Sequence, residues 1–296
     1  MSNIGFIGLG NMGGPMAANL VKSGERVIGF DVVEASRQAS ARDGVQIFAT
    51  ARGCVENADV VISMLPAGEH VLSVWKDILP IANQGSLFID CSTIDVASAR
   101  SAHALAAERG IATLDAPVSG GVGGAKTATL TFMVGGSKKA FEHGKPILER
   151  MGKRVVHCGE AGNGQVAKIC NNMILGISMI AVSEAFVLGE KLGLSHQALF
   201  DVASASSGQC WSLTSYCPVT GPVPASPANN DYKPGFAAAL MLKDLNLARE
   251  AAQSVKANTA LGAQAAEIYE RFAQEGHSGA DFSAIIKRVR EQSSAG

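Results

Sequence analysis

A chain of 296 residues, 47% of them hydrophobic and 17% charged, is long enough for two ordinary domains and has the composition of a well-packed globular protein. Its formal net charge is −1 and it lacks clustered Lys and Arg, so small molecules are better expected partners than nucleic acid. The six cysteines form no CxxC pair and no zinc-type spacing with histidine, so we expect reduced thiols and no metal site. No charged and apolar leader precedes the first strand, which predicts a cytoplasmic protein.

The chain begins with the order strand, glycine-rich turn, helix. Residues 3–7 are a short apolar strand, and a G-x-G-x-x-G sequence follows, Gly8-Leu9-Gly10-Asn11-Met12-Gly13. Gly8 allows the tight turn, Gly10 lets the backbone approach a pyrophosphate, and Gly13 permits close packing of the helix on the strand. The free amides and the dipole at the start of the helix hold the anion, so this segment predicts a dinucleotide-binding domain.

An acidic residue at the end of the second strand bears on the choice of cofactor. This strand covers residues 26–30 and is followed by Asp31, which lies 18 residues after Gly13. A carboxylate at this position accepts hydrogen bonds from the adenosine ribose hydroxyls and repels a 2′-phosphate. The pattern therefore favours NAD over NADP, and Arg37 is too far along the chain to reverse this preference.

Two further apolar strands are predicted at residues 60–66 and 86–90. In an open parallel sheet, ligands gather beyond the carboxyl ends of the strands, so we expect Leu65, Pro66 and Thr93 near the cofactor. As alternatives, Pro66 terminates its strand and Thr93 is the N-cap of the next helix.

Two histidines of this half, His70 and His103, have no partner that the sequence identifies. Both lie in segments that follow a predicted strand. We expect helix-surface residues rather than catalytic groups.

A strand at residues 112–118 leads into a glycine-rich segment, Ser119-Gly120-Gly121-Val122-Gly123-Gly124-Ala125. Four glycines in five positions expose backbone amides that can bind a carboxylate, and the alternative is a flexible linker. Strands at 129–134 and 154–158, with a helix at 138–151 between them, are expected to close the sheet.

The strand signal ends near residue 162, and long helical periods follow. We therefore expect an α/β protein with two domains. Residues 1–162 are predicted to form a Rossmann-like NAD-binding domain with a doubly wound, mostly parallel sheet. Residues 163–296 are predicted to form an all-helical domain for substrate binding and oligomerisation, built on a long interdomain helix. The most apolar stretch of that helix contains Glu184 and is shorter than a membrane span, so we expect it to be buried.

The start of this helix contains the best catalytic candidate. Lys168 and Asn172 are four residues apart, so in a helix their side chains share one face and can reach one small polar ligand. The alternative is a surface lysine with a nearby polar residue. An apolar run over residues 173–182 places Lys168 at the edge of buried surface instead. Because desolvation disfavours an ammonium and lowers its pKa, such a lysine can exchange protons near neutrality.

The remaining helices are predicted at residues 194–205, after Gly235-Phe236, at 260–272 and at 282–289. Residues 218–234 hold five of the ten prolines, which indicates a functional or mobile loop, with disorder as the alternative. By spacing alone, Lys243 and Asp244 are a solvated helix edge.

These motifs resemble the β-hydroxyacid dehydrogenase family over nearly the whole chain. The matching segments are Gly5 to Gly13, Asp115-Ala116-Pro117-Val118-Ser119-Gly120-Gly121, Gly164 to Asn172, and Gly235-Phe236 through Lys243-Asp244-Leu245. The first motif is widely shared, whereas the second and third together are specific to the family. Trp211-Ser212 and the 218–234 loop are most similar to the hydroxyisobutyrate branch.

The resemblance implies roles for individual residues. Lys168 would be the general acid/base, and the substrate would contact Ser119, Gly120, Gly121 and Asn172. The NAD contacts would come from the glycine-rich turn (Gly8, Leu9, Gly10, Asn11, Met12 and Gly13) and from Asp31, Leu65, Pro66, Thr93, Phe236 and Lys243. His70 lies where relatives often have a further polar contact to the cofactor.

The implied reaction is the NAD-dependent oxidation of 3-hydroxyisobutyrate to methylmalonate semialdehyde, a step of valine catabolism. Hydride would pass to NAD+ while Lys168 accepts the hydroxyl proton. Tartronate semialdehyde reduction, or oxidation of serine or another short β-hydroxy acid, remains an alternative, as does a non-catalytic dinucleotide-binding module. The resemblance further implies a homodimer or homotetramer without nucleic acid or membrane partners.

Overall fold

The protein, as a computed structural model, is described over residues 1–294 and divides into two compact units. The first unit covers Met1–Lys168, and the second begins at Ile169. The division therefore falls within α7 (Asn163–Lys191), the longest helix of the described chain. Lys168 is the last residue of the first unit.

The first unit is built on one sheet, which has nine strands over the described residues. They are β1 (Asn3–Ile7), β2 (Arg26–Phe30), β3 (Gln46–Ile47), β4 (Val60–Ser63), β5 (Leu87–Asp90), β6 (Ala112–Asp115), β7 (Val118–Ser119), β8 (Leu130–Gly135) and β9 (Gly152–Gly159). The order is β3-β2-β1-β4-β5-β6-β8-β7, with β9 paired to β8. The strands β1 to β6 pair in parallel, whereas β8 runs antiparallel to β6 and β7. The mostly parallel, Rossmann-like sheet is confirmed.

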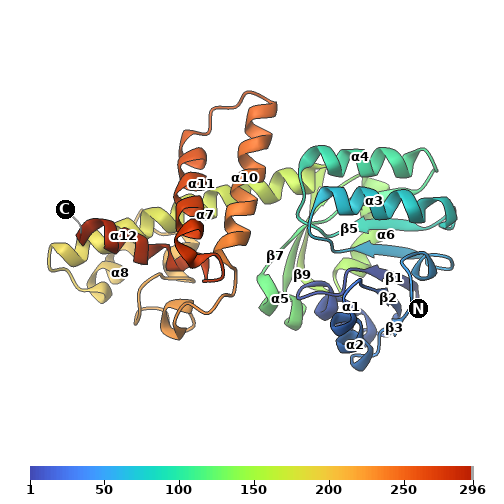
Figure 1. The fold of residues 1–296 in the computed structure, drawn as a ribbon, viewed down its shortest axis with the longest axis horizontal. Helices are drawn as coiled ribbons and strands as arrows, with labels where there is room; N and C mark the ends of the chain where they lie inside the picture. Colours follow the sequence, from blue (N-terminus) through green and yellow to red (C-terminus); the bar gives the residue numbers. More distant parts are fainter. Residues whose placement is uncertain (295–296) are drawn as a thin grey trace. The chain divides into compact units, whose positions relative to one another are not determined.

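Helices cover both faces of the sheet (Figure 1). They are α1 (Gly13–Lys22), α2 (Glu34–Arg42), α3 (Gly68–Ile78), α4 (Val96–Ala107), α5 (Gly121–Thr127) and α6 (Lys138–Leu148), with short 3₁₀ turns η1 (Arg52–Cys54) and η2 (Leu79–Ile81). Strand residues alternate between two buried clusters, because side chains along a strand point to opposite faces. Phe6 and Ile89 pack with α1 and α6, whereas Ile7 and Phe88 pack with α3 and α4.

The order of the strands reverses between β1 and β4, and ligands of open α/β sheets bind at such a switch point. The backbone is tight there. Gly8 has φ 95°, and a Cβ on it would lie 2.2 Å from the carbonyl oxygen of Met64. A Cβ on Gly13 would lie 1.9 Å from the carbonyl oxygen of Gly8. Only glycine fits at either position.

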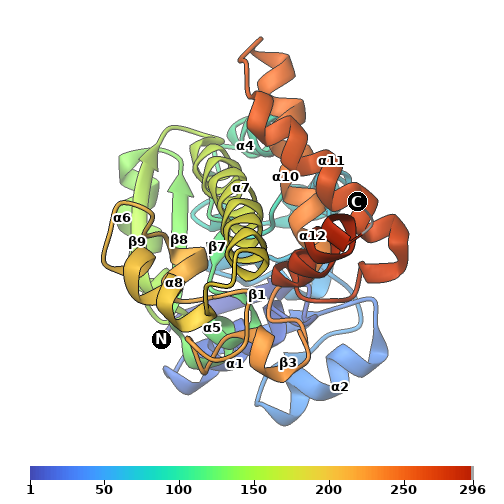
Figure 2. The ribbon, with the colours of Figure 1, turned by 90° about the vertical axis from the view of Figure 1, so that its left-hand side faces the viewer.

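The second unit is helical. It contains most of α7 together with α8 (His196–Ser204), α9 (Trp211–Thr214), α10 (Ala238–Ser254), α11 (Ala260–Phe272) and α12 (Ile285–Ser294), and the short turns η3 (Pro227–Asn230), η4 (Ala273–His277) and η5 (Phe282–Ala284). Figure 2 looks nearly along α7 and shows α10, α11 and α12 gathered on one side of it. Phe186, Met241 and Tyr269 from three of these helices meet in one buried cluster. The expectation that this apolar stretch is shorter than a membrane span is wrong, because α7 is long and apolar enough to cross one. Half of its most apolar part is nevertheless buried within the protein, as in a core helix.

Three local expectations are wrong. The predicted strand 112–118 breaks at Ala116-Pro117, because proline has no amide to donate to the ladder. The flexible linker, which was the alternative for the glycine-rich segment, is wrong, since Gly121–Thr127 form α5. Thr93 is not the cap of α4, because the carboxylate of Asp95 accepts the amide of Ser98 at 2.7 Å.

The proline-rich segment 218–234 is folded. Tyr232 donates its hydroxyl to the carbonyl oxygen of Pro218 at 2.7 Å, and Asn229 donates its amide to that of Val223 at 2.9 Å. Val219 and Ala228 are buried. Side-chain hydrogen bonds therefore add to the backbone hydrogen bonds of this segment, such as those from Ser226 to Val223 and from Tyr232 to Pro227.

The tight packing of Gly13 gives a testable consequence. We expect Gly13→Ala to lower the free energy of unfolding by about 1–3 kcal/mol, because the added methyl group overlaps a backbone carbonyl. Gly10→Ala is the matched control, since no atom lies within 4 Å of its Cβ position. We expect it to change stability by less than about 0.5 kcal/mol. Urea unfolding of the two variants measures the difference, and equal midpoints would contradict the packing described.

Candidate active site

The glycine-rich turn is held by the residue that follows β2. The carboxylate of Asp31 accepts the amide of Leu9 at 2.7 Å and that of Val33, also at 2.7 Å. Arg37 donates to the backbone carbonyl of Asp31 at 2.6 Å and pairs with Glu34. Arg37 is therefore engaged by an acidic neighbour rather than directed at a 2′-phosphate.

Each member of the turn lies at the switch point, with different exposure. Gly8, Leu9 and Gly13 are buried, Met12 is half-buried, and Gly10 and Asn11 are exposed. The exposed Gly10 has no atom within 4 Å of its Cβ position. The turn thus leaves open space beside the backbone, as a bound pyrophosphate requires.

A hydrogen-bonded chain fixes the turn after β4. Ser63 and Ser92 donate their hydroxyls to Oδ1 of Asp90 at 2.7 and 2.6 Å, and Trp75 donates to the Ser63 hydroxyl at 3.2 Å. The hydroxyl of Ser92 in turn accepts the amide of Leu65 at 2.8 Å. Leu65 is half-buried and Pro66 exposed, beside the carboxyl ends of β4 and β5. We expected Leu65 and Pro66 here, but the sequence alone did not reveal the buried groups that hold them.

Asp90 is a strongly perturbed carboxyl. It is 3% exposed, and burial, opposed by the hydrogen bonds from Ser92 and Ser63, raises its pKa from 3.8 to about 6. Within the described residues, Oδ2 of Asp90 has no hydrogen-bond partner, which is consistent with a carboxyl that readily holds a proton.

A buried glutamine holds the segment that contains Thr93. Gln165 donates its side-chain amide to the carbonyl oxygen of Ser92 at 2.8 Å, and its side-chain oxygen accepts the amide of Ile94 at 3.2 Å. The two bonds flank Thr93, which is half-buried. Gln165 belongs to the first turn of α7, so this helix and the end of β5 are joined here.

Lys168 lies one turn further along α7. It is 6% exposed, which excludes the surface lysine considered from the sequence. Its ammonium donates to the carbonyl oxygen of Val118 at 2.9 Å. Val118 directly precedes Ser119, and Gly120 and Gly121 have φ 132° and 61°. The fold thus brings Lys168 to the start of the segment proposed to bind a carboxylate.

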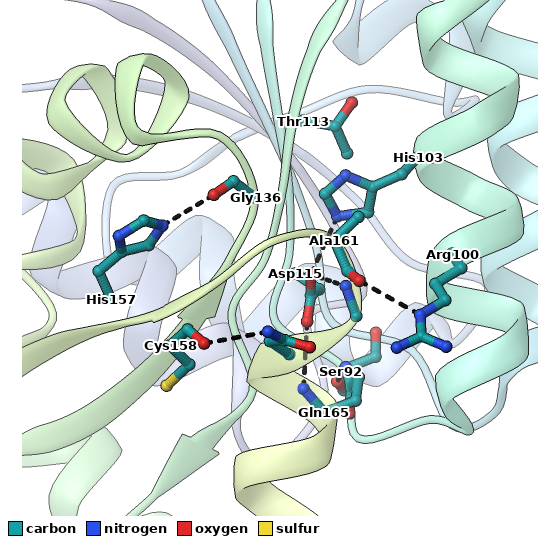
Figure 3. Close-up of polar contacts among 12 residues, drawn as sticks. Ser92, Arg100, His103, Thr113, Asp115, Gly136, His157, Cys158, Ala161 and Gln165 are labelled. Carbon is teal, nitrogen blue, oxygen red and sulfur yellow. Dashed lines mark hydrogen bonds and ion pairs between the residues drawn. The ribbon is translucent and has the colours of Figure 1, made fainter. Parts of the chain in front are cut away.

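Asp115, at the end of β6, meets the start of α7 (Figure 3). It accepts the amides of Gly162 at 2.8 Å and Gln165 at 3.1 Å, and Nε2 of His103 lies 3.0 Å from Oδ1. The expectation of a helix-surface role for His103 is wrong, because its side chain is only 13% exposed and has this buried partner. His70, in contrast, is exposed on α3.

The remaining predicted residues belong to the second unit. Asn172 is 2% exposed and donates its side-chain amide to Asp244 at 2.5 Å. The solvated-edge interpretation is wrong for Asp244, which is 4% exposed, while Lys243 beside it is half-buried. The backbone amide of Phe236 donates to the carboxylate of Asp281 at 3.1 Å. Its ring packs edge-on against that of Phe282, with 5.8 Å between the ring centroids.

The chain matches two protein-family models. Residues 3–159 match the family described as the NAD binding domain of 6-phosphogluconate dehydrogenase, and residues 162–289 match that described as NAD-binding of NADP-dependent 3-hydroxyisobutyrate dehydrogenase. The chain is 53% identical to a Mycobacterium tuberculosis protein named "Probable 3-hydroxyisobutyrate dehydrogenase", over 100% of both chains. It is 46% identical to the NAD-dependent L-serine dehydrogenase of Pseudomonas aeruginosa, over 97% of both chains.

A solved structure is similar over almost the whole length. The structure described as Mycobacterium tuberculosis 3-hydroxyisobutyrate dehydrogenase with L-serine has a TM-score of 0.96 and 53% sequence identity. The match covers 98% of this chain and 99% of that chain. Each unit therefore has the fold that is seen in that dehydrogenase structure.

The raised pKa of Asp90 predicts a pH dependence of stability. Its carboxyl is protonated in the folded state up to a higher pH than in the unfolded chain. The stabilisation is therefore complete below about pH 4 and is lost as the pH rises through about 6. Relative to Asp90→Asn, whose side chain is neutral throughout, we expect the wild type to lose up to about 3 kcal/mol between pH 4 and 7.5.

Chemical unfolding at several pH values measures this difference. Asp43→Asn, a change at an exposed carboxyl, is the matched control and should leave the pH profile unchanged. A constant free-energy difference between wild type and Asp90→Asn would contradict the description of Asp90.

Proposed function

The chain belongs to the β-hydroxyacid dehydrogenases, in the 3-hydroxyisobutyrate dehydrogenase branch, and we propose that it oxidises 3-hydroxyisobutyrate to methylmalonate semialdehyde with NAD+. This is a step of valine catabolism, and we propose that it takes place in the cytoplasm. One observation carries the proposal. The buried ammonium of Lys168 lies against the carbonyl oxygen of Val118, directly before Ser119-Gly120-Gly121.

The residues at the switch point fit a dinucleotide. The space beside Gly10 admits a phosphate to the backbone, and Asp31 offers a carboxylate at the end of β2 for the ribose hydroxyls. We propose that the turn Gly8 to Gly13 and Asp31 hold NAD, with Leu65, Pro66 and Thr93 beside it. NAD+ when bound supplies the hydride acceptor. Phe236 and Lys243 as further contacts remain predictions from the family resemblance.

The proposed work of the protein is placement and proton transfer. The amides of Ser119, Gly120 and Gly121 bind the substrate carboxylate, and Lys168 as the neutral amine accepts the proton of the substrate hydroxyl. In the reverse direction the ammonium returns that proton. Asn172 follows Lys168 by one helical turn on the same face of α7 and orients the reacting oxygen.

The two structural units suggest a division of labour. We propose that residues 1–162 are the NAD-binding domain and residues 163–296 the substrate and oligomerisation domain. A homodimer or homotetramer is proposed as the working form. We propose that the exposed apolar side chains of α7, among them Ile174 and Leu188 at 66% and 62% exposure, lie in the contact between subunits.

L-Serine is the second candidate substrate. It has a carboxylate and a primary hydroxyl on the β-carbon, as 3-hydroxyisobutyrate does. A relative that is 46% identical is named an NAD-dependent L-serine dehydrogenase, and the similar solved structure is described with L-serine. Tartronate semialdehyde reduction uses the same proposed groups. A non-catalytic module is disfavoured, because burying an ammonium is costly and such a module has no use for it.

We expect NADH formation from NAD+ and 3-hydroxyisobutyrate, and a fall in kcat of about 10²- to 10⁴-fold in Lys168→Ala, because general base catalysis is lost. Lys139→Ala, at an exposed position of α6, is the matched control and should retain wild-type activity. NADH absorbance measures turnover, and protein fluorescence measures NAD+ binding. L-Serine and glycerate are assayed in parallel.

The outcomes separate the alternatives. Higher kcat/KM with L-serine or glycerate would replace the substrate but keep the mechanism. Full activity of Lys168→Ala would contradict the mechanism itself. NAD+ binding without turnover of any of these substrates would favour the non-catalytic module.

A further inference from the structure

The carboxylate of Asp115 has no part in the proposed chemistry, yet it is 1% exposed. Removing a carboxylate from water costs several kcal/mol unless hydrogen bonds satisfy it. Its partners are the amides of Gly162 and Gln165 and the ring of His103, all between 2.8 and 3.1 Å away. Through these contacts the buried carboxylate of Asp115 holds the backbone of Gly162 and Gln165 and the ring of His103 in place.

Asp115 binds the N-terminus of the helix that contains Lys168. The first amides of a helix have no partner within the helix, and they favour a negative group. In most helices a short side chain next to the first turn fills this role. Here α7 receives its cap from the end of β6, about 50 residues earlier in the chain. The cap therefore ties the helix to the sheet as well as stabilising its end.

Two glycines make room for this arrangement. A Cβ on Gly135, the β8 partner of Asp115 in the sheet, would lie 2.5 Å from Oδ1 of Asp115. A Cβ on Gly164 would lie 2.7 Å from Oδ2 and 2.6 Å from the backbone carbonyl oxygen of Asp115. The strand end and the first turn of α7 are thus in direct backbone contact. The first turn of α7 therefore has little freedom to move along the end of β6.

Gln165 supplies a second attachment from the same turn. Its fully buried side chain bonds the backbone of Ser92 and Ile94, at the end of β5. Its own backbone amide is one of the two that Asp115 accepts. One residue therefore links the ends of β5 and β6 to α7.

The geometry of a helix carries these attachments to Lys168. Side chains three and four positions apart share a face, so Lys168 lies above Gly164 and Gln165. The carboxylate of Asp115 touches that face, since it is 2.7 Å from the Cβ position of Gly164. We propose that Asp115 and Gln165 are positioning residues, which set the rotation and depth of the first turns of α7 and so place the Lys168 ammonium beside Ser119. This proposal rests on the proposed function of Lys168.

Asp115→Ala and Asp115→Asn test the first attachment. Alanine removes both hydrogen bonds to the amides of Gly162 and Gln165. Asparagine has nearly the same shape as aspartate and keeps one acceptor oxygen. Because a misplacement of about 1 Å can cost about 10²-fold in rate, we expect kcat to fall roughly 10- to 100-fold in Asp115→Ala and less in Asp115→Asn. The dissociation constant of NAD+ should change by less than about three-fold, because the glycine-rich turn is untouched.

Two further variants distinguish a loss of positioning from a general loss of stability. Gln165→Met keeps the length of the side chain and removes both of its hydrogen bonds, and it should also lower kcat more than it raises KM. Ser137→Ala is the matched control. Ser137 caps α6 by accepting the amide of Ala140 at 3.2 Å, and α6 contains no residue of the proposed site. This variant loses a helix cap in the same unit but should keep kcat within about two-fold.

The readouts are kcat, KM for 3-hydroxyisobutyrate, the NAD+ dissociation constant and circular dichroism, with Lys168→Ala in parallel. A fall in kcat in folded Asp115 and Gln165 variants, graded from alanine to asparagine, supports positioning. Wild-type kcat in these variants with an inactive Lys168→Ala overturns it and leaves the proposed function standing. An active Lys168→Ala instead overturns the function. Weaker NAD+ binding at unchanged kcat, or an equal loss in Ser137→Ala, also overturns positioning.

Discussion

The capping of α7 by Asp115 is the interaction on which the candidate site depends. A helix that begins at a sheet edge must satisfy its first amides, and here a strand of that sheet supplies the acceptor. Because the same turn is attached through Gln165 to the end of β5, two strand ends act together on one helix. The position of Lys168 is thereby linked to the sheet that binds the cofactor in our proposal.

A second buried acid acts in parallel at the strand ends where we propose that NAD binds. Asp90 holds Ser92, and Ser92 holds the amide of Leu65, at the carboxyl ends of β5 and β4. Ser92 also receives the side chain of Gln165 through its carbonyl oxygen. One hydrogen-bonded system therefore extends from the turn after β4 to the start of α7. Such a system suits the proposed hydride transfer, because NAD and Lys168 as the proposed proton acceptor must be fixed relative to each other.

The sequence was sufficient for the parts of the molecule that local pattern determines. The predicted bounds are confirmed for the strands 3–7 and 26–30 and for the helix 260–272. Apolar periodicity identifies these elements, and a glycine or an acidic residue next to a strand marks its end. The sequence predicted exposed positions for His103 and Asp244, which are wrong, and it assigned no role of its own to Asp115. Their partners lie 12 to 72 residues away, and only the folded chain brings them together. Lys168 could be identified because a charged ammonium beside an apolar helical run is costly to bury. Residues that break the local pattern in this way are frequent at functional sites.

In the function that we propose, Lys168 exchanges the proton of the substrate hydroxyl. A crystal structure of the protein with NAD+ and 3-hydroxyisobutyrate tests it most directly. We expect the ammonium nitrogen of Lys168 within about 3.2 Å of the hydroxyl oxygen, with the carboxylate on the amides of Ser119, Gly120 and Gly121. A substrate hydroxyl bonded to another side chain, with the ammonium of Lys168 out of hydrogen-bond reach of it, would contradict this role.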